Sequence, residues 1–143
     1  MSLRTLVLAP LAALALIGSA CSSGNDAGGE TGDGIAATLS DFAIDLAETS
    51  APTGSVSFDI RNDGPSIHEF EVLRTDLAAD ELPVDSGVVQ TSAEGVEIVD
   101  EIEEIAPGTN AELSIDVDAG SYVIICNVVG HYESGMFAPF TVE

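Results

Sequence analysis

The chain has 143 residues, which is the size of one domain and leaves no room for a separate catalytic domain. It is 45% hydrophobic and 20% charged, and its 25 acidic residues face only 3 Lys or Arg, which gives a formal net charge of −22. This composition supplies a packed core and excludes a disordered acidic chain. Nucleic acid is excluded as a partner, because the charge repels phosphate and three arginines cannot form a basic patch.

Residues 1–20 predict an export signal peptide. Arg4 precedes the apolar residues 6–17, and the small residues Gly18, Ser19 and Ala20 follow them. A membrane-spanning helix needs about 20 apolar residues. This run is shorter and contains Pro10, so a permanent anchor helix is the less favoured alternative. We therefore expect the protein to be exported.

Cys21 follows the small residues in a pattern that resembles the lipobox of bacterial lipoproteins, whose cysteine is acylated and becomes the mature N-terminus. Gly18 stands where a lipobox most often has leucine, so cleavage by an ordinary signal peptidase is the alternative. Residues 22–34 are Gly, Ser and acidic residues without an apolar pattern, which predicts a flexible tether. We expect residues 21–34 to be a lipidated cysteine and its tether, at the outer face of the cell membrane or in the periplasm.

From Ile35 onward, apolar and polar residues alternate, which predicts β-strands with one buried face. The clearest runs are residues 42–46, 56–60 and 113–117, and turn sequences rich in Gly, Pro, Asn and Asp separate the strands. Residues 96–105 fit helical and strand spacing about equally, and we interpret them as a strand. Residues 75–87 predict a long connection with a helical turn. The pattern as a whole predicts an all-β, antiparallel β-sandwich for residues 35–143.

Four side chains that can bind a metal remain once Met1 and Cys21 are set aside: His68, Cys126, His131 and Met136. The last three are spaced as C-x4-H-x4-M between two predicted strands, residues 122–126 and 136–142. His68 opens another predicted strand, residues 68–72, just after the turn at residues 62–65. Strand alternation turns His68 inward together with Phe70 and Val72. We expect all four side chains to meet at one end of the sandwich.

A thiolate, two imidazoles and a thioether are the ligands of a trigonal copper site with a weak axial ligand, which carries one electron. Zinc is the alternative metal, but a thioether binds zinc poorly. Each residue also has an ordinary structural interpretation, as a buried hydrogen-bonding histidine, a core cysteine or a gap-filling methionine. A disulfide between Cys21 and Cys126 is a further alternative in an oxidising compartment.

The sequence resembles the cupredoxins, the family of small blue copper proteins. The resemblance spans residues 35–143 and depends on the segments 122–136 and 62–70, which contain the four candidate ligands in the family's order. It implies a Greek-key sandwich with one type 1 copper per chain, held by His68, Cys126 and His131 in the equatorial plane and by Met136 on the axis. The sequence departs from the family at Glu69 and Asn127, which stand where other hydrogen-bonding residues are frequent.

We interpret the protein as a one-electron carrier and not as an enzyme, because a copper ion with a closed ligand shell binds no substrate. Electrons would pass through the edge of His131, surrounded by an apolar docking patch of Pro65, Val128, Val129, Gly130 and Tyr132, although Tyr132 suits ordinary packing equally well. The expected partners are redox proteins, such as a membrane cytochrome or a terminal oxidase, and the carrier itself is expected to be a monomer.

Two other classes of function remain open. A copper-delivery lipoprotein would bind the metal without transferring electrons, and a metal-free sandwich would serve adhesion. The acidic surface has two interpretations, which are solubility in high external salt and steering toward a basic partner. Charge screening in salt favours the first of these two.

Overall fold

A computed structural model describes residues 33–143, so the predicted signal peptide, Cys21 and most of the predicted tether lie outside the described residues. The described chain is built from strands and one short 3-10 turn, η1 (Tyr132–Ser134). The strands are β1 (Ile35–Ser40), β2 (Ala43–Leu46), β3 (Ser50–Ala51), β4 (Gly54–Asn62), β5 (His68–Arg74), β6 (Val84–Asp85), β7 (Val88–Val89), β8 (Glu97–Ile105), β9 (Asn110–Val117), β10 (Gly120–Ile125) and β11 (Phe137–Val142). No helix within residues 33–143 is long and apolar enough to cross a membrane.

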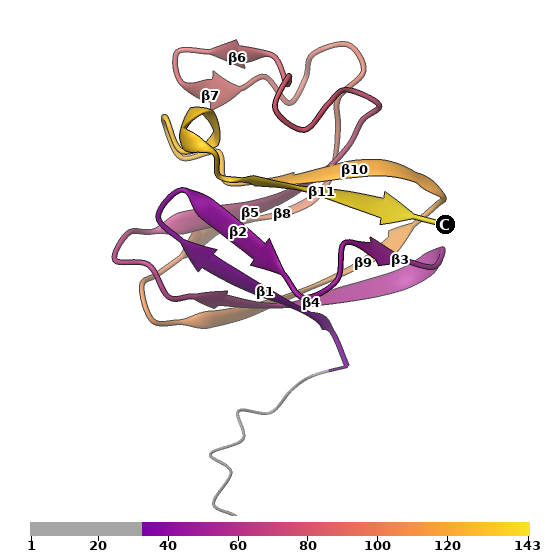
Figure 1. The fold of residues 1–143 in the computed structure, drawn as a ribbon, viewed down its shortest axis with the longest axis horizontal. Helices are drawn as coiled ribbons and strands as arrows, with labels where there is room; N and C mark the ends of the chain where they lie inside the picture. Colours follow the sequence, from indigo (N-terminus) through magenta and orange to yellow (C-terminus); the bar gives the residue numbers. More distant parts are fainter. Residues whose placement is uncertain (1–32) are drawn as a thin grey trace, which may run out of the picture.

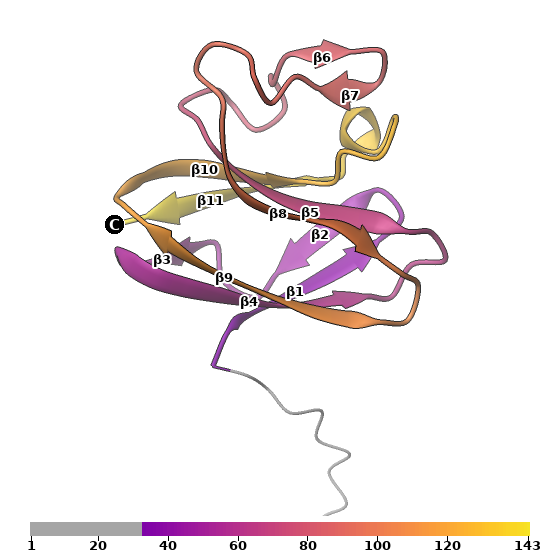
Figure 2. The same ribbon diagram turned by 180° about the vertical axis from the view of Figure 1, so that it is seen from behind.

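Two sheets form the sandwich. One has the strand order β2-β1-β4-β9, and the other has the order β3-β11-β10-β5-β8. The sheets lie face to face, and the small β6-β7 hairpin lies over the outer face of the five-stranded sheet (Figures 1 and 2). The predicted all-β sandwich is therefore confirmed, and residues 96–105, which were ambiguous in the sequence, form the edge strand β8.

The prediction that the sandwich is antiparallel is wrong for two strand pairs. β1 runs parallel to β4, and β3 runs parallel to β11, whereas the other pairs are antiparallel. Parallel neighbours need a crossover between them. The crossover between β1 and β4 is formed by the chain segment that contains β3, because β3 belongs to the other sheet. Residue alternation along single strands contains no information on such a crossover.

The main core fills the space between the sheets, and strand alternation explains its composition. In β4 the inward residues Val56, Phe58 and Ile60 are buried while their neighbours are more exposed. Phe58 is fully buried and contacts the rings of Phe70 and Phe140, with centroids 5.4 Å away in each case. Burying aromatic and branched side chains of this kind contributes most of the stabilisation of a small sandwich. His68, Cys126 and Met136 border this core and are themselves fully buried.

A second cluster lies on the outer face of the five-stranded sheet, beneath residues 75–96. The predicted helical turn in residues 75–87 is absent, because this segment forms turns and the β6-β7 hairpin instead. Tyr132 ties the segment to the sheet, since its hydroxyl accepts a hydrogen bond from the backbone N–H of Leu82 (2.9 Å) and donates one to the carbonyl of Ala79 (2.8 Å). Tyr132 is only 4% exposed, so of its two predicted roles, docking patch and ordinary packing, the structure supports packing.

Glu71 is the one buried carboxylate in β5 and faces away from the main core, as strand alternation requires. Its side chain is 7% exposed, and its Oε2 has no hydrogen-bond partner within residues 33–143. Burial, together with the neighbouring carboxylates of Glu101 and Glu69, raises the pKa of Glu71 to about 7. The Glu71 carboxyl group therefore keeps its proton up to a pH of about 7 in the folded protein, whereas in the unfolded chain it loses the proton near its ordinary pKa of 4.5.

This burial predicts a pH-dependent stability. Because the pKa of Glu71 is raised on folding, its contribution favours folding at acidic pH and is lost as the pH rises from about 4.5 through about 7. Glu71→Gln should raise the free energy of unfolding at pH 8 by on the order of 1 kcal/mol and change it little at pH 4.5. Thermal unfolding of the metal-free protein at both pH values measures the effect. The control is Glu112→Gln in β9, which removes an exposed charge; an equal shift in the control would contradict the assignment to Glu71.

Candidate metal centre

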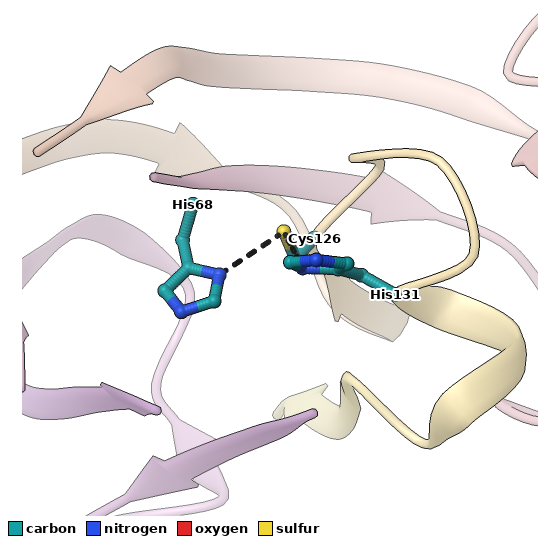
Figure 3. Close-up of side chains that lie close together, drawn as sticks. All are labelled: His68, Cys126 and His131. Atoms are coloured by element: carbon teal, nitrogen blue, oxygen red, sulfur yellow. Dashed lines mark hydrogen bonds between the residues drawn. The ribbon is translucent and has the colours of Figure 1, made fainter. Parts of the chain in front are cut away.

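The start of β5, the end of β10 and η1 meet at the end of the sandwich opposite the C-terminus (Figure 1). Three side chains that can bind a metal lie there, one from residue 68 and two from the loop after β10. His68 begins β5, Cys126 directly follows β10, and His131 directly precedes η1. One ligand atom from each residue lies within 4.8 Å of the others, and within residues 33–143 no other group of His, Cys, Asp and Glu has this geometry. Figure 3 shows both imidazole rings facing the sulfur.

The distances between the donor atoms match those expected around one metal ion. Cys126 Sγ lies 3.8 Å from His68 Nδ1 and 3.5 Å from His131 Nδ1. With metal–sulfur and metal–nitrogen bonds of about 2.3 Å and 2.0 Å, two ligands of one ion at angles of about 110–120° lie roughly 3.5–3.8 Å apart. The same ring atom, Nδ1, faces the sulfur in both histidines. The two sulfur–nitrogen distances are therefore those of ligands that share one metal ion.

Met136, the fourth predicted ligand, is tied to the other ligands through the backbone. It is fully buried beside Cys126 in the main core. The N–H of Cys126 donates to the carbonyl of Met136 (3.1 Å), and the N–H of Met136 donates to the carbonyl of His131 (3.0 Å). Gly135 closes the turn between η1 and Met136 with a φ of 106°, in the region that favours glycine. The four residues are of the types that a type 1 copper site uses, and the structure brings the donor atoms of His68, Cys126 and His131 together. Met136 lies in the same buried core and stays a predicted ligand.

The electrostatics of the cluster suit a soft metal cation. Burial lowers the pKa of His68, with the nearby His131 as a further cause, and burial also raises the pKa of the Cys126 thiol. Both shifts favour the neutral forms of His68 and Cys126 when no metal is bound. A neutral imidazole is the metal-binding form, and a bound metal ion removes the proton of a coordinating thiol.

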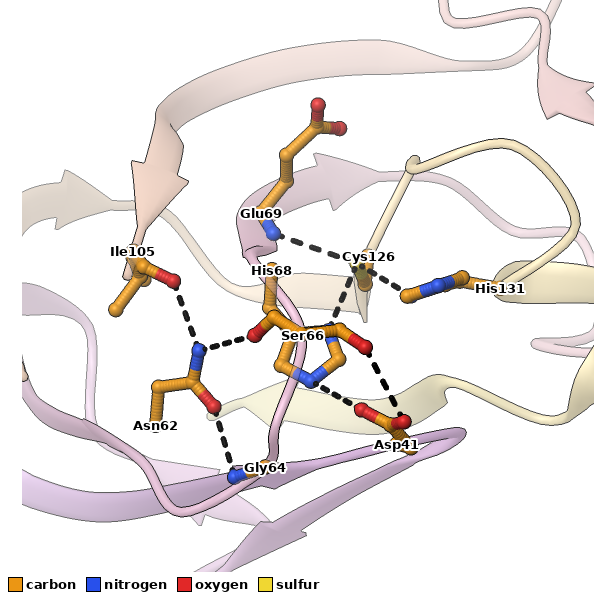
Figure 4. A network of polar contacts seen from close by, with 9 residues as sticks. All are labelled: Asp41, Asn62, Gly64, Ser66, His68, Glu69, Ile105, Cys126 and His131. Atoms are coloured by element: carbon orange, nitrogen blue, oxygen red, sulfur yellow. Dashed lines mark hydrogen bonds and ion pairs between the residues drawn. The ribbon is translucent and has the colours of Figure 1, made fainter. Parts of the chain in front are cut away.

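A fully buried asparagine holds the turn that delivers His68 (Figure 4). Asn62 Nδ2 donates to the carbonyls of Ser66 and Ile105, at 2.8 Å each, and its Oδ1 accepts from the N–H of Gly64 at 2.9 Å. Position 64 also favours glycine, because a Cβ there would lie 2.8 Å from His68 Nε2. The turn is predicted by the residues at 62–65, but the supporting role of Asn62 has no signal in the sequence pattern.

The two departures from the family pattern have structural explanations. The backbone N–H of Glu69 donates to Cys126 Sγ at 3.3 Å, a contact that is independent of the side chain at position 69. The Asn127 side chain accepts from the N–H of Val89 (2.7 Å) and donates to its carbonyl (3.3 Å), so it fastens the ligand loop to β7. Asn127 therefore supports the site by holding the loop that follows Cys126.

His131 is the only one of the four ligand residues with partial exposure. The ring of Phe42, 49% exposed, packs edge-on against the His131 ring with centroids 5.4 Å apart. Ile67, next to His68, is 46% exposed, and Val129 in the ligand loop is 69% exposed. The predicted docking patch contains Val129 but not Phe42 or Ile67. A signal for Ile67 existed, since alternation that places His68 inward turns Ile67 outward.

No family model matches the sequence, and no curated protein matches it. Among solved structures, auracyanin from the photosynthetic bacterium Roseiflexus castenholzii is similar with a TM-score of 0.59 and 21% identity, over 76% of this chain and 95% of that one. Rusticyanin from Thiobacillus ferrooxidans is similar with a TM-score of 0.56 and 16% identity, over 79% of each chain. A multicopper oxidase from Pediococcus acidilactici gives a TM-score of 0.52 and 14% identity, over 80% of this chain and 27% of the oxidase.

The described residues therefore have the β-sandwich fold of the cupredoxins, as the resemblance implied. At this level of identity the likeness establishes the fold. The site is supported independently by the donor atoms of His68, Cys126 and His131, which lie within 4.8 Å of one another.

The close approach of Gly64 to His68 predicts that Gly64→Ala weakens metal binding. The added Cβ must displace His68, so the affinity for copper should fall on the order of 10-fold to 100-fold, as for other changes that disturb a ligand's support. Competition with a chelator measures the change. Gly54→Ala is the control, because its φ of 118° makes alanine strained there while no atom lies within 4 Å of the new Cβ. Equal losses of affinity in the two variants would contradict the prediction.

Proposed function

We propose that this protein binds one copper ion in a type 1 site and acts as a one-electron carrier. The observation that carries the proposal is the convergence of two imidazole Nδ1 atoms on one buried thiol at 3.5 Å and 3.8 Å. A bound copper ion would supply the Cu(I)/Cu(II) couple. The soft sulfur atoms suit Cu(I), the imidazoles suit Cu(II), and the rigid sandwich limits rearrangement between the two states.

The protein's own residues enclose most of the site. His68, Cys126 and Met136 are fully buried, and only His131 is partly exposed, so the candidate ligands leave a single exposed edge. A closed ligand shell favours electron transfer over bond chemistry, and on this basis we propose that the protein is not an enzyme. The similar multicopper oxidase is far longer than this chain, which matches 27% of it.

The exposed edge of His131 is the proposed route for the electron. Phe42, Ile67 and Val129 are three of the five exposed large hydrophobic residues among the described residues. Phe42 contacts His131, and the other two lie within two residues of a ligand. A small apolar surface of this kind suits the brief encounters of redox proteins. We propose that a redox protein, such as a membrane cytochrome or a terminal oxidase, docks there to a monomeric carrier.

We further propose that the protein is exported and is attached to the outer face of the cell membrane, or retained in the periplasm, through a lipid on Cys21. The support for this proposal lies in the sequence, where Cys21 follows an apolar segment and small residues. The acidic tether that follows would let the copper domain move near the membrane and reach a partner.

The copper proposal predicts a visible absorption band in the protein with bound Cu(II). Addition of Cu(II) to the purified protein should produce an intense blue thiolate-to-copper absorption band, and ascorbate should bleach it reversibly. Cys126→Ser should lack the band because it removes the thiolate. Cys21→Ser is the matched control and should retain the band, since the chain has two cysteines and only Cys126 belongs to the site. A folded protein without the band would contradict the electron-carrier proposal and leave copper delivery without electron transfer as the next candidate.

The lipid proposal predicts the mass of the mature N-terminus. Mass spectrometry of the protein from its own host should show a chain that begins at Cys21 and carries acyl groups. Cys21→Ser should abolish the acylation and release the protein from membranes. A mature chain with an unmodified cysteine or a different first residue would contradict the lipid anchor without affecting the copper proposal.

A further inference from the structure

We propose that Asp41 is a positioning residue of the metal centre. Its carboxylate holds His68 in the tautomer that leaves Nδ1 free for the metal, and its negative charge favours Cu(II) over Cu(I). This inference rests on the proposed copper function and concerns the ring nitrogen of His68 that does not face Cys126.

Two buried polar atoms face each other at this position. His68 Nε2 lies 3.3 Å from Asp41 Oδ1, and neither atom has a hydrogen bond to any other group within residues 33–143 (Figure 4). Buried polar atoms in folded proteins almost always have a partner. Because both atoms otherwise lack a partner, a hydrogen on Nε2 would let this pair form a hydrogen bond, whereas a hydrogen on Nδ1 would leave both atoms unpaired.

The position of the carboxylate is specified by its surroundings. Ser66 Oγ donates to Asp41 Oδ2 at 3.2 Å, which holds the second oxygen. A Cβ at Gly64 would lie 3.1 Å from Asp41 Oδ1 and 2.8 Å from His68 Nε2, so the glycine keeps open the space in which the two groups meet. Asp41 lies in the two-residue turn between β1 and β2, and therefore reaches His68 from the opposite sheet.

The chemistry of the pair fixes the tautomer. A neutral imidazole has one N–H, and an ionised carboxylate can only accept a hydrogen bond. With the hydrogen on Nε2, the lone pair of Nδ1 faces Cys126 Sγ, where the metal would bind. A carboxylate behind a ligating histidine orients the ring and increases its basicity.

The negative charge of Asp41 would lower the reduction potential of the proposed copper couple. A nearby negative charge stabilises the more positive metal ion more strongly, so it favours Cu(II). The Asp41 side chain is 32% exposed, which reduces the effect through solvent screening without removing it. The reduction potential of the site should therefore be lower than it would be with a neutral residue at this position.

The first test needs no copper. Nitrogen-15 NMR of the histidine rings in the metal-free protein reports which nitrogen has the hydrogen. We expect His68 to be the Nε2–H tautomer in the wild type and in Asp41→Asn, whose side-chain carbonyl still accepts, and a loss of this preference in Asp41→Ala. A wild type with the hydrogen on Nδ1, or an Asp41→Ala variant that retains the wild-type tautomer, would overturn the positioning role.

The second test isolates the charge in the copper-loaded protein by potentiometric titration, in which the electrode supplies and removes the single electron. Asp41→Asn should keep the blue band and lower the ratio of Cu(II) to Cu(I) affinity about 10-fold, which raises the potential of a one-electron couple by about 59 mV. Asp45→Asn in β2 is the matched control, because it removes an exposed charge from the same hairpin. An unchanged potential in Asp41→Asn, or equal shifts in both variants, would overturn the role of the charge.

The two tests separate this inference from the proposed function. A wild-type protein that forms no blue band defeats the copper-carrier proposal and with it the redox role of Asp41, while the NMR result still decides whether Asp41 sets the His68 tautomer. A blue wild-type protein with an insensitive potential keeps the carrier and rejects the role of the Asp41 charge.

Discussion

The short separation between Cys126 Sγ and the two Nδ1 atoms is the constraint on which this end of the sandwich depends. A thiol and two imidazoles from two chain segments lie together although burial of polar groups is unfavourable. Backbone hydrogen bonds to the ligand loop and the Asn62 network to the turn before His68 hold them in place. The donor geometry is therefore present in the fold itself, and metal binding would need little ordering of the chain.

The four ligand residues divide into a buried set and a single surface contact. His68, Cys126 and Met136 are enclosed by the main core, whereas His131 lies at the surface with Phe42 against its ring. This asymmetry gives the site one exposed edge, where the Phe42 ring packs on His131 in a chain with a strongly acidic composition. A partner that docks there would meet an apolar ring beside the candidate ligand, and the exposed carboxylate of Glu133 lies two residues further along the chain.

The sequence predicted the parts of the site that depend on local patterns. Strand alternation correctly turned His68, Cys126 and Met136 into the core, because a period of two leaves only two faces to choose from. It could not find Asp41, whose partner His68 becomes its neighbour only when the two sheets pack together. The parallel pairing of β1 with β4 and the buried hydroxyl contacts of Tyr132 also depend on tertiary structure, which residue spacing does not encode.

The β1-β2 turn touches both histidines from the opposite sheet. Asp41 faces the His68 ring, and Phe42, with a φ of 67° that is unusual for a bulky residue, packs on the His131 ring. The ligands and their two supports thus belong to different layers of the sandwich, and the contacts between them last only while the sheets remain packed. An opening of the β1-β2 hairpin alone would therefore remove the support of both rings without displacing a ligand.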